Sequence, residues 1–179
     1  MTRIPLSISG VERRAAILSV AVGCSLMAVK FTAYVLTGSS AIFSDALESI
    51  VNVLASLFAL YSLLLAHRPA DAEHPYGHGK IEFMSAGFEG GLIVLAALAI
   101  GVKTLDTLLF HQIRIEQLGV GLILVAAAML GNGATGVYLI RLGRRYGSMT
   151  LEADGKHLLS DAVTSIAALT ALAIVKLTG

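Results

Sequence analysis

Charged residues are scarce in this chain, and tryptophan is absent: only 14% of the 179 residues are Asp, Glu, Lys or Arg. A soluble domain devotes about a quarter of its residues to these four types. The formal net charge is +1, and no cluster of basic and aromatic residues stands out along the sequence. We therefore expect neither a soluble fold nor a nucleic-acid partner.

Cysteine and proline are also rare. Cys24 is the single cysteine, so an internal disulfide is excluded and the redox compartment is left open. Residues 1–10 are polar and lack a small-residue cleavage site at the right place, so the first apolar segment is predicted to be retained and not removed as a signal peptide. Two of the three prolines fall within residues 67–82, where we predict a loop.

Apolar residues are abundant: 56% of the chain is hydrophobic, and the mean hydropathy is +0.80. The apolar runs are each close to the roughly 20 residues that an α-helix needs to cross a bilayer. The sequence therefore predicts an all-α, multi-pass integral membrane protein. Its five transmembrane helices are predicted over residues 14–37, 41–66, 83–110, 117–141 and 153–177. The short connection at 37–40 predicts an antiparallel hairpin for the first two.

Basic residues are distributed unevenly about these helices, which predicts their orientation. Nine lie at one end, three of them in the loop predicted after the fourth helix: Arg3, Arg13, Arg14, Arg68, Lys80, Arg141, Arg144, Arg145 and Lys156. Three lie near the other end, namely Lys103, Arg114 and Lys176. The N-terminus is therefore predicted to be cytoplasmic. Lys30 lies inside the first helix, where it would snorkel or pair with an acid.

The fifth predicted helix carries His157 and Asp161 four residues apart, which places them on one face about one turn apart. An imidazole and a carboxylate stacked in this way can bind one divalent cation. A carboxylate in a bilayer costs about 2.5–3.5 kcal/mol, so a partner is expected. The alternative is a helix that begins in the interface, where lipid headgroups solvate both groups.

The second predicted helix carries a polar stripe at positions i, i+3, i+7 and i+11, made of Asp45, Glu48, Asn52 and Ser56. Glu48 and Asn52 form a second i, i+4 pair, so two helices together offer an imidazole nitrogen, two carboxylates and an amide oxygen. Four such ligands suit zinc or a similar divalent ion. The stripe could instead be a seam of interhelical hydrogen bonds, but two carboxylates in one seam repel each other without a cation.

The loop at 67–82 holds a further group of metal-ligand residue types: Asp71, His74 and His78. Pro75 and Gly77 can turn the backbone so that the three side chains converge. They would then form a weak, solvent-exposed metal site at the cytoplasmic mouth. An ordinary solvated loop is the alternative.

Three strings in this order resemble the cation diffusion facilitator family: Ser44-Asp-Ala-Leu-Glu-Ser49, His74-Pro-Tyr-Gly-His-Gly-Lys-Ile-Glu82 and His157-x-x-x-Asp161. The resemblance implies a homodimeric transporter, not an enzyme, that exports divalent cations from the cytoplasm in exchange for protons, here across a bacterial inner membrane. It implies a transport site of Glu48, Asn52, His157 and Asp161, with Asp45 as a neighbouring carboxylate, and a loop site of Asp71, His74 and His78.

The chain departs from the family pattern in two respects. Zinc-transporting members commonly have His or Asp where this chain has Glu48, and Asp where it has Asn52. These departures leave manganese, iron, cobalt and cadmium open as the transported ion, while the family resemblance makes zinc the first candidate. The family also has a sixth span and a cytoplasmic C-terminal domain, so residues 1–179 are interpreted as a transmembrane domain without them.

Two other function classes are considered. An intramembrane metalloenzyme would need a general base and an open metal position, and the His-Glu-x-x-His motif that commonly announces them is absent. A non-transporting, metal-binding membrane subunit or a truncated assembly or regulatory partner is the alternative that the sequence leaves open.

Overall fold

The computed structural model describes residues 10–37, 40–110 and 119–178, and within these ranges the chain forms five α-helices and no strand. The all-α architecture and the number of helices predicted from the sequence are confirmed. The helices are α1 (Gly10–Thr37), α2 (Ser40–Ala66), α3 (Ile81–Phe110), α4 (Gly119–Tyr146) and α5 (Met149–Thr178).

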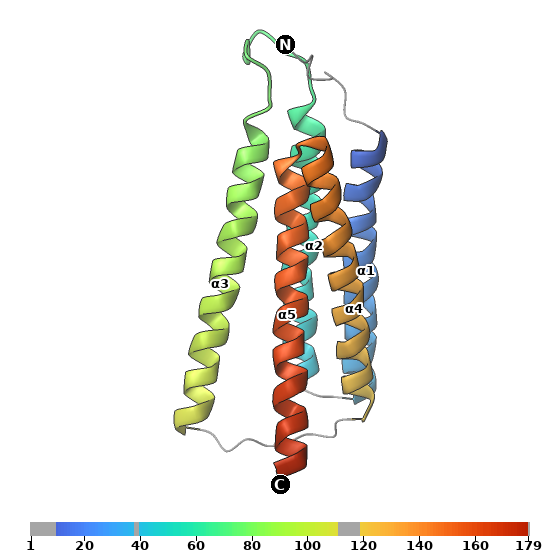
Figure 1. The fold of residues 1–179 in the computed structure, drawn as a ribbon, viewed down its shortest axis with the longest axis vertical. Coiled ribbons are helices and arrows are strands. Elements are labelled where there is room, and N and C mark those ends of the chain that lie inside the picture. Colours follow the sequence, from blue (N-terminus) through green and yellow to red (C-terminus); the bar gives the residue numbers. More distant parts are fainter. Residues whose placement is uncertain (1–9, 38–39, 111–118, 179) are drawn as a thin grey trace.

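The helices form an up-and-down bundle (Figure 1). α1, α3 and α5 run in one direction, and α2 and α4 run in the other. α1 packs against α2, as the short connection predicts, and α4 packs along α5. α3 stands at the edge of the bundle, against α5 and α2. The loop between α2 and α3 lies at the end where α1 begins, which is the end predicted to be cytoplasmic from the basic residues.

The boundary between the fourth and fifth helices differs from the prediction. α4 continues to Tyr146, so Arg141, Arg144 and Arg145 lie in its final turns and not in a loop. Basic side chains at a helix C-terminus interact favourably with the helix dipole, which explains why this polar stretch stays helical. Gly147, at φ 74°, ends the helix, and the Ser148 hydroxyl accepts a hydrogen bond from the Leu151 amide to begin the next.

The distribution of polar and apolar side chains is that of a membrane protein. Segments of α1, α2 and α3 are long and apolar enough to cross a bilayer: Gly10–Val35, Asp45–Ala66 and Ile81–Val102, with mean hydropathies of 1.8, 2.0 and 1.9. α4 and α5 turn polar residues such as Asn132 and His157 into the bundle, while apolar side chains such as Leu95 face outwards. The chain is therefore an integral membrane protein.

Backbone-to-backbone contact holds α4 against α5. A Cβ on Gly136 would lie 2.7 Å from the Gly155 carbonyl oxygen, and a Cβ on Gly155 would lie 2.8 Å from that of Gly136. Apolar side chains gain little by leaving lipid, so helices in a bilayer rely on such close approach for van der Waals contact. Because Gly155 lies between Asp154 and Lys156 on α5, this contact fixes the depth of the polar residues described below.

Replacing Gly155 with Ala should therefore destabilise the bundle. Overpacking of this kind costs about 1–3 kcal/mol, which would appear as a lower thermal midpoint of the purified protein in detergent. Gly91→Ala is the matched control: it brings the same gain in helix propensity, but nothing lies within 4 Å of a Cβ at Gly91. Equal midpoints for the two variants would contradict the close packing of α4 and α5.

Candidate metal-binding site

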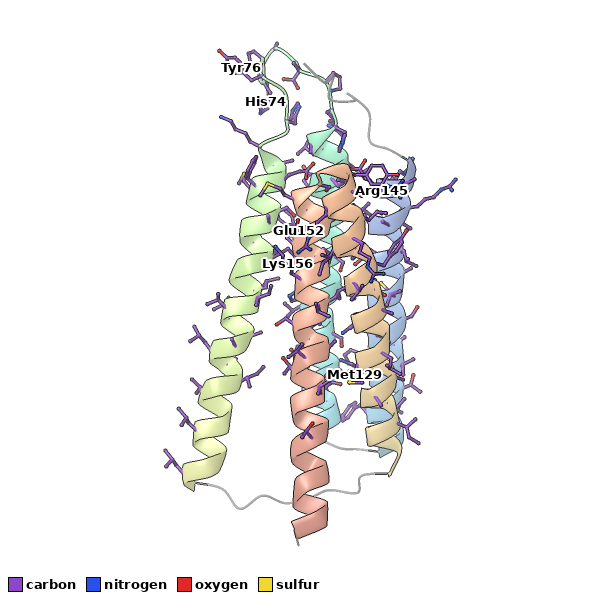
Figure 2. All side chains as sticks on the ribbon, in the orientation of Figure 1. His74, Tyr76, Met129, Arg145, Glu152 and Lys156 are labelled. Atoms are coloured by element: carbon purple, nitrogen blue, oxygen red, sulfur yellow. The ribbon has the colours of Figure 1, made fainter. Side chains whose placement is uncertain are left out.

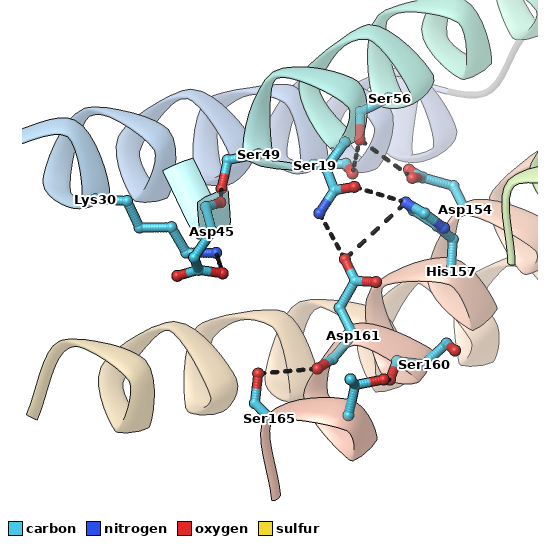
Figure 3. A network of polar contacts seen from close by, with 12 residues as sticks. Ser19, Lys30, Asp45, Ser49, Ser56, Asp154, His157, Ser160, Asp161 and Ser165 are labelled. Atoms are coloured by element: carbon cyan, nitrogen blue, oxygen red, sulfur yellow. Dashed lines mark hydrogen bonds and ion pairs between the residues drawn. The ribbon is translucent and has the colours of Figure 1, made fainter. Parts of the chain in front are cut away.

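One asparagine joins α2 to α5 inside the bundle, and Figure 3 shows the two α5 residues that it contacts, His157 and Asp161. Asn52 Nδ2 donates a hydrogen bond to Asp161 Oδ2 over 2.6 Å, and Asn52 Oδ1 lies 3.1 Å from His157 Nε2. His157 Nε2 is itself 4.0 Å from Asp161 Oδ2. The amide thus bridges the imidazole and the carboxylate that the i, i+4 spacing places on one face of α5.

The bridge determines where the imidazole carries hydrogen. An amide oxygen has no hydrogen to donate, so the contact between His157 Nε2 and Asn52 Oδ1 requires a hydrogen on Nε2. The other ring nitrogen, Nδ1, is buried and has no hydrogen-bond partner among the described residues. A metal ligand must present a free lone pair, so a cation that binds at Nε2 has to displace its hydrogen.

The four residues predicted to hold the ion differ in exposure. His157 is 3% exposed, and the Asp161 side chain is 13% exposed. Glu48 lies one turn from Asn52 on α2 and is exposed, although its negative charge acts on Asp161. The structure therefore brings Asn52, His157 and Asp161 into direct contact and places Glu48 on the exposed side of α2. These four residues are called the central site below.

Asp45 lies in an ion pair on the far side of the central site from the α2–α3 loop. Lys30 Nζ on α1 is 2.8 Å from Asp45 Oδ1, which confirms that Lys30 pairs with an acid. Both charges also act on Asp161. Lys30, Asn52 and Asn132 help to line a cavity of about 10 Å³, which is room for about one water molecule. The central site therefore adjoins this small cavity inside the bundle.

A chain of polar contacts that the sequence analysis did not identify continues towards the cytoplasmic end. The Ser19 and Ser56 hydroxyls lie 3.2 Å apart, and Ser56 donates to Asp154 Oδ1 over 3.2 Å. Asp154 is 1% exposed. It lies three residues before His157 on α5, so helical spacing was the signal that could have identified it. The fully buried Glu89 of α3 was also missed.

The loop residues Asp71, His74 and His78 do converge: one ligand atom from each lies within 4.8 Å of the other two. Asp71 Oδ1 is 3.2 Å from His74 Nδ1, and Asp71 Oδ2 is 3.5 Å from His78 Nε2. Gly77 takes a positive φ of 78°, which makes the turn possible. Figure 2 shows His74 and Tyr76 on this loop, beyond the ends of the helices. These three residues are called the loop site.

Hydrogen bonds within the loop hold Asp71 in place. Its Oδ1 accepts hydrogen bonds from the backbone amides of His74 and Glu73, over 2.7 and 3.1 Å. The hydrogen bond from the His74 amide is the main reason that the pKa of Asp71 lies below its usual value. Asp71 therefore stays ionised at every physiological pH and can attract a cation to the loop.

Comparison with known proteins agrees with the family resemblance of the sequence. Residues 16–179 match the family model described as the cation efflux transmembrane domain. The chain is 42% identical over 164 residues to an uncharacterized transporter of Synechocystis, covering 92% of this chain and 53% of that protein. It is 32% identical over 164 residues to the cation-efflux pump FieF of Klebsiella pneumoniae, covering 90% and 53%.

A third relative is a probable cation efflux system protein of Mycobacterium tuberculosis. It is 29% identical over 141 residues, which cover 79% of this chain and 42% of that protein. The chain therefore spans about half the length of the curated relatives that it matches.

Proposed function

We propose that this chain, which belongs to the cation efflux family, forms the membrane part of a transporter that exports divalent metal cations from the cytoplasm. The observation that carries the proposal is the Asn52 bridge, which gathers an imidazole, a carboxylate and an amide from two helices in the interior of the bundle. A polar group of this kind inside a membrane protein marks an ion pathway, because burying it has a cost that packing alone does not recover.

In this proposal, a cation replaces the Asn52 bridge. It binds His157 Nε2, an Asp161 carboxylate oxygen and Asn52 Oδ1, after the Nε2 hydrogen has left. Glu48 completes the set by turning in from the exposed side of α2. Two carboxylates then neutralise the two positive charges of the ion, and four ligands suit a tetrahedral geometry. Zinc is the first candidate, while the neutral Asn52 and the oxygen-rich ligand set leave manganese, iron, cobalt and cadmium open.

Transport follows from the division of the ligands between two helices. A small rotation of α5 relative to α2 would open the central site first to one side of the membrane and then to the other. The loop site concentrates cations at the cytoplasmic mouth, since its ionised Asp71 attracts them and its imidazoles bind them weakly. We place the protein in the bacterial inner membrane as a homodimer, as expected from the family resemblance.

In the proton exchange that we propose, His157 is an imidazolium when the site is empty. An imidazolium carries hydrogen on both ring nitrogens. When a cation binds at Nε2, one proton leaves and the ring becomes neutral, with its remaining hydrogen on Nδ1. Protons that enter from the outer side then displace the cation outwards, and the next cation from the cytoplasm displaces them inwards.

Replacing Asp161 with Ala should abolish the export. Loss of a residue that only supports a metal ligand costs about 10- to 100-fold. Asp161→Ala removes a charged ligand itself, so cation flux into proteoliposomes should fall by more than that. Glu152→Gln is the control. It removes a carboxylate from the same helix, but the partners of that carboxylate are Lys156 and Arg144. Undiminished flux in Asp161→Ala, or no flux in the parent chain, would contradict the proposal.

Protons should compete with the cation at His157. Apparent cation affinity is expected to weaken as pH falls from about 8 to 5.5, the range over which histidines commonly titrate. His157→Gln keeps a polar side chain that cannot titrate, so it should flatten this dependence. The measurement is initial flux against cation concentration at a series of pH values. A parent protein whose affinity is constant over this range would show that transport is not coupled to protons through His157.

A further inference from the structure

A second buried carboxylate lies in the bundle outside the central site. Glu89 of α3 is 0% exposed, whereas its neighbours Phe88 and Gly90 are exposed, so its side chain points into the bundle. Neither of its carboxylate oxygens has a hydrogen-bond partner within the part of the chain that the structure describes. A buried carboxylate without a partner is costly, so this arrangement points to a ligand.

Contacts at the cytoplasmic ends of α3 and α5 establish the depth of Glu89. Glu82 Oε2 accepts hydrogen bonds from the Ser148 hydroxyl (3.2 Å) and the Thr150 amide (3.4 Å). The two helices run in the same direction. Seven residues advance a helix by about 10 Å, so Glu89 lies level with the stretch of α5 from Asp154 to His157. The negative charge of Asp154 acts on Glu89, which agrees with this placement.

An aromatic contact shows which part of α2 lies beside this part of α3. The rings of Phe58 on α2 and Phe88 on α3 have centroids 5.0 Å apart. Because α2 and α3 are antiparallel, Ser62 and Ser85 lie at similar depths, each about one turn from its phenylalanine towards the cytoplasmic end. Both hydroxyls are buried, and neither has a partner among the residues described.

At this depth, α5 also has buried oxygen atoms in the same condition. Asp154 Oδ1 accepts from Ser56, but Asp154 Oδ2 is buried without a partner in the described ranges. The Thr150 hydroxyl, one turn towards the cytoplasmic end, is likewise buried and unpartnered there. α3 and α5 thus each present a carboxylate and a hydroxyl in an i, i+4 pair, Ser85 with Glu89 and Thr150 with Asp154.

We propose that Glu89 and Asp154, with the hydroxyls of Ser62, Ser85 and Thr150, bind a second divalent cation about one helical turn to the cytoplasmic side of His157. The ion neutralises the two carboxylates, and the hydroxyl oxygens occupy part of its remaining coordination sphere. All the ligands are oxygen atoms, so the site takes hard cations such as Mn²⁺ in preference to zinc. It is called the α3–α5 site.

The α3–α5 site has a different role from the central site. It holds the cation between the loop site and His157, with a ligand set that contains no nitrogen. Its place on a transport route rests on the proposed function, but its ability to bind a cation does not. An equilibrium binding measurement can therefore test it without any transport.

The experiment counts Mn²⁺ ions bound to the purified chain in lipid nanodiscs by equilibrium dialysis. All proteins carry His74→Ala and His78→Ala, which remove the loop site. We expect two Mn²⁺ per chain in this background and one in Glu89→Gln. Glu152→Gln is the matched control and should keep two. Ser85→Ala, a smaller change, should weaken the binding of one ion at least about threefold, because it removes one neutral ligand.

The outcomes separate the α3–α5 site from the central site. Equal Mn²⁺ counts for Glu89→Gln and Glu152→Gln would overturn the inference. Should Glu89→Gln fail to fold by size-exclusion chromatography, Ser85→Ala decides, and unchanged affinity there would overturn it as well. If Asp161→Ala leaves both ions bound while Glu89→Gln removes one, the α3–α5 site stands and the proposed central site fails.

Discussion

The hydrogen-bonded bridge from Asn52 to His157 and Asp161 is the interaction on which the rest of the structure depends. It joins two helices that are far apart in sequence, and it gives one hydrogen bond to each of two ionisable groups that lipid cannot solvate. The glycine contact between α4 and α5 supports it by fixing the depth of α5. The bridge is also replaceable, because an amide offers an oxygen to a cation as readily as to an imidazole.

Polar groups continue from this bridge along the bundle in both directions. Towards the outer side, Lys30 forms an ion pair with Asp45. Towards the cytoplasm, Asp154 and Glu89 have buried oxygens without a hydrogen-bond partner among the described residues. Asp45 is therefore already paired with a cation, whereas the buried carboxylates of Asp154 and Glu89 have oxygens to which no described residue donates a hydrogen bond.

The fold followed from local patterns in the sequence. Apolar runs predicted five helices, and i, i+4 spacing placed His157 and Asp161 on one face, because both depend only on neighbouring residues. The predicted end of the fourth helix was wrong, because basic residues that suit a loop also stabilise a helix C-terminus. The contact between Asp154 and Ser56 could not be predicted, since it depends on which face of α2 meets α5. The burial of Glu89 could not be predicted either, since it depends on which face of α3 packs against α2 and α5. The exposure of Glu48 is likewise set by the rotation of α2 in the bundle.

The most direct test of the account is the zinc X-ray absorption spectrum of the chain with His74→Ala and His78→Ala, loaded with one equivalent of zinc. A cation shared by α2 and α5 should show one imidazole nitrogen at about 2.0–2.1 Å and oxygen ligands at about 2.0–2.2 Å. The imidazole signal should disappear in His157→Ala, and the oxygen shell should shrink in Asn52→Ala. Zinc bound without an imidazole, or a spectrum that Asn52→Ala leaves unchanged, would contradict a cation site shared by these two helices.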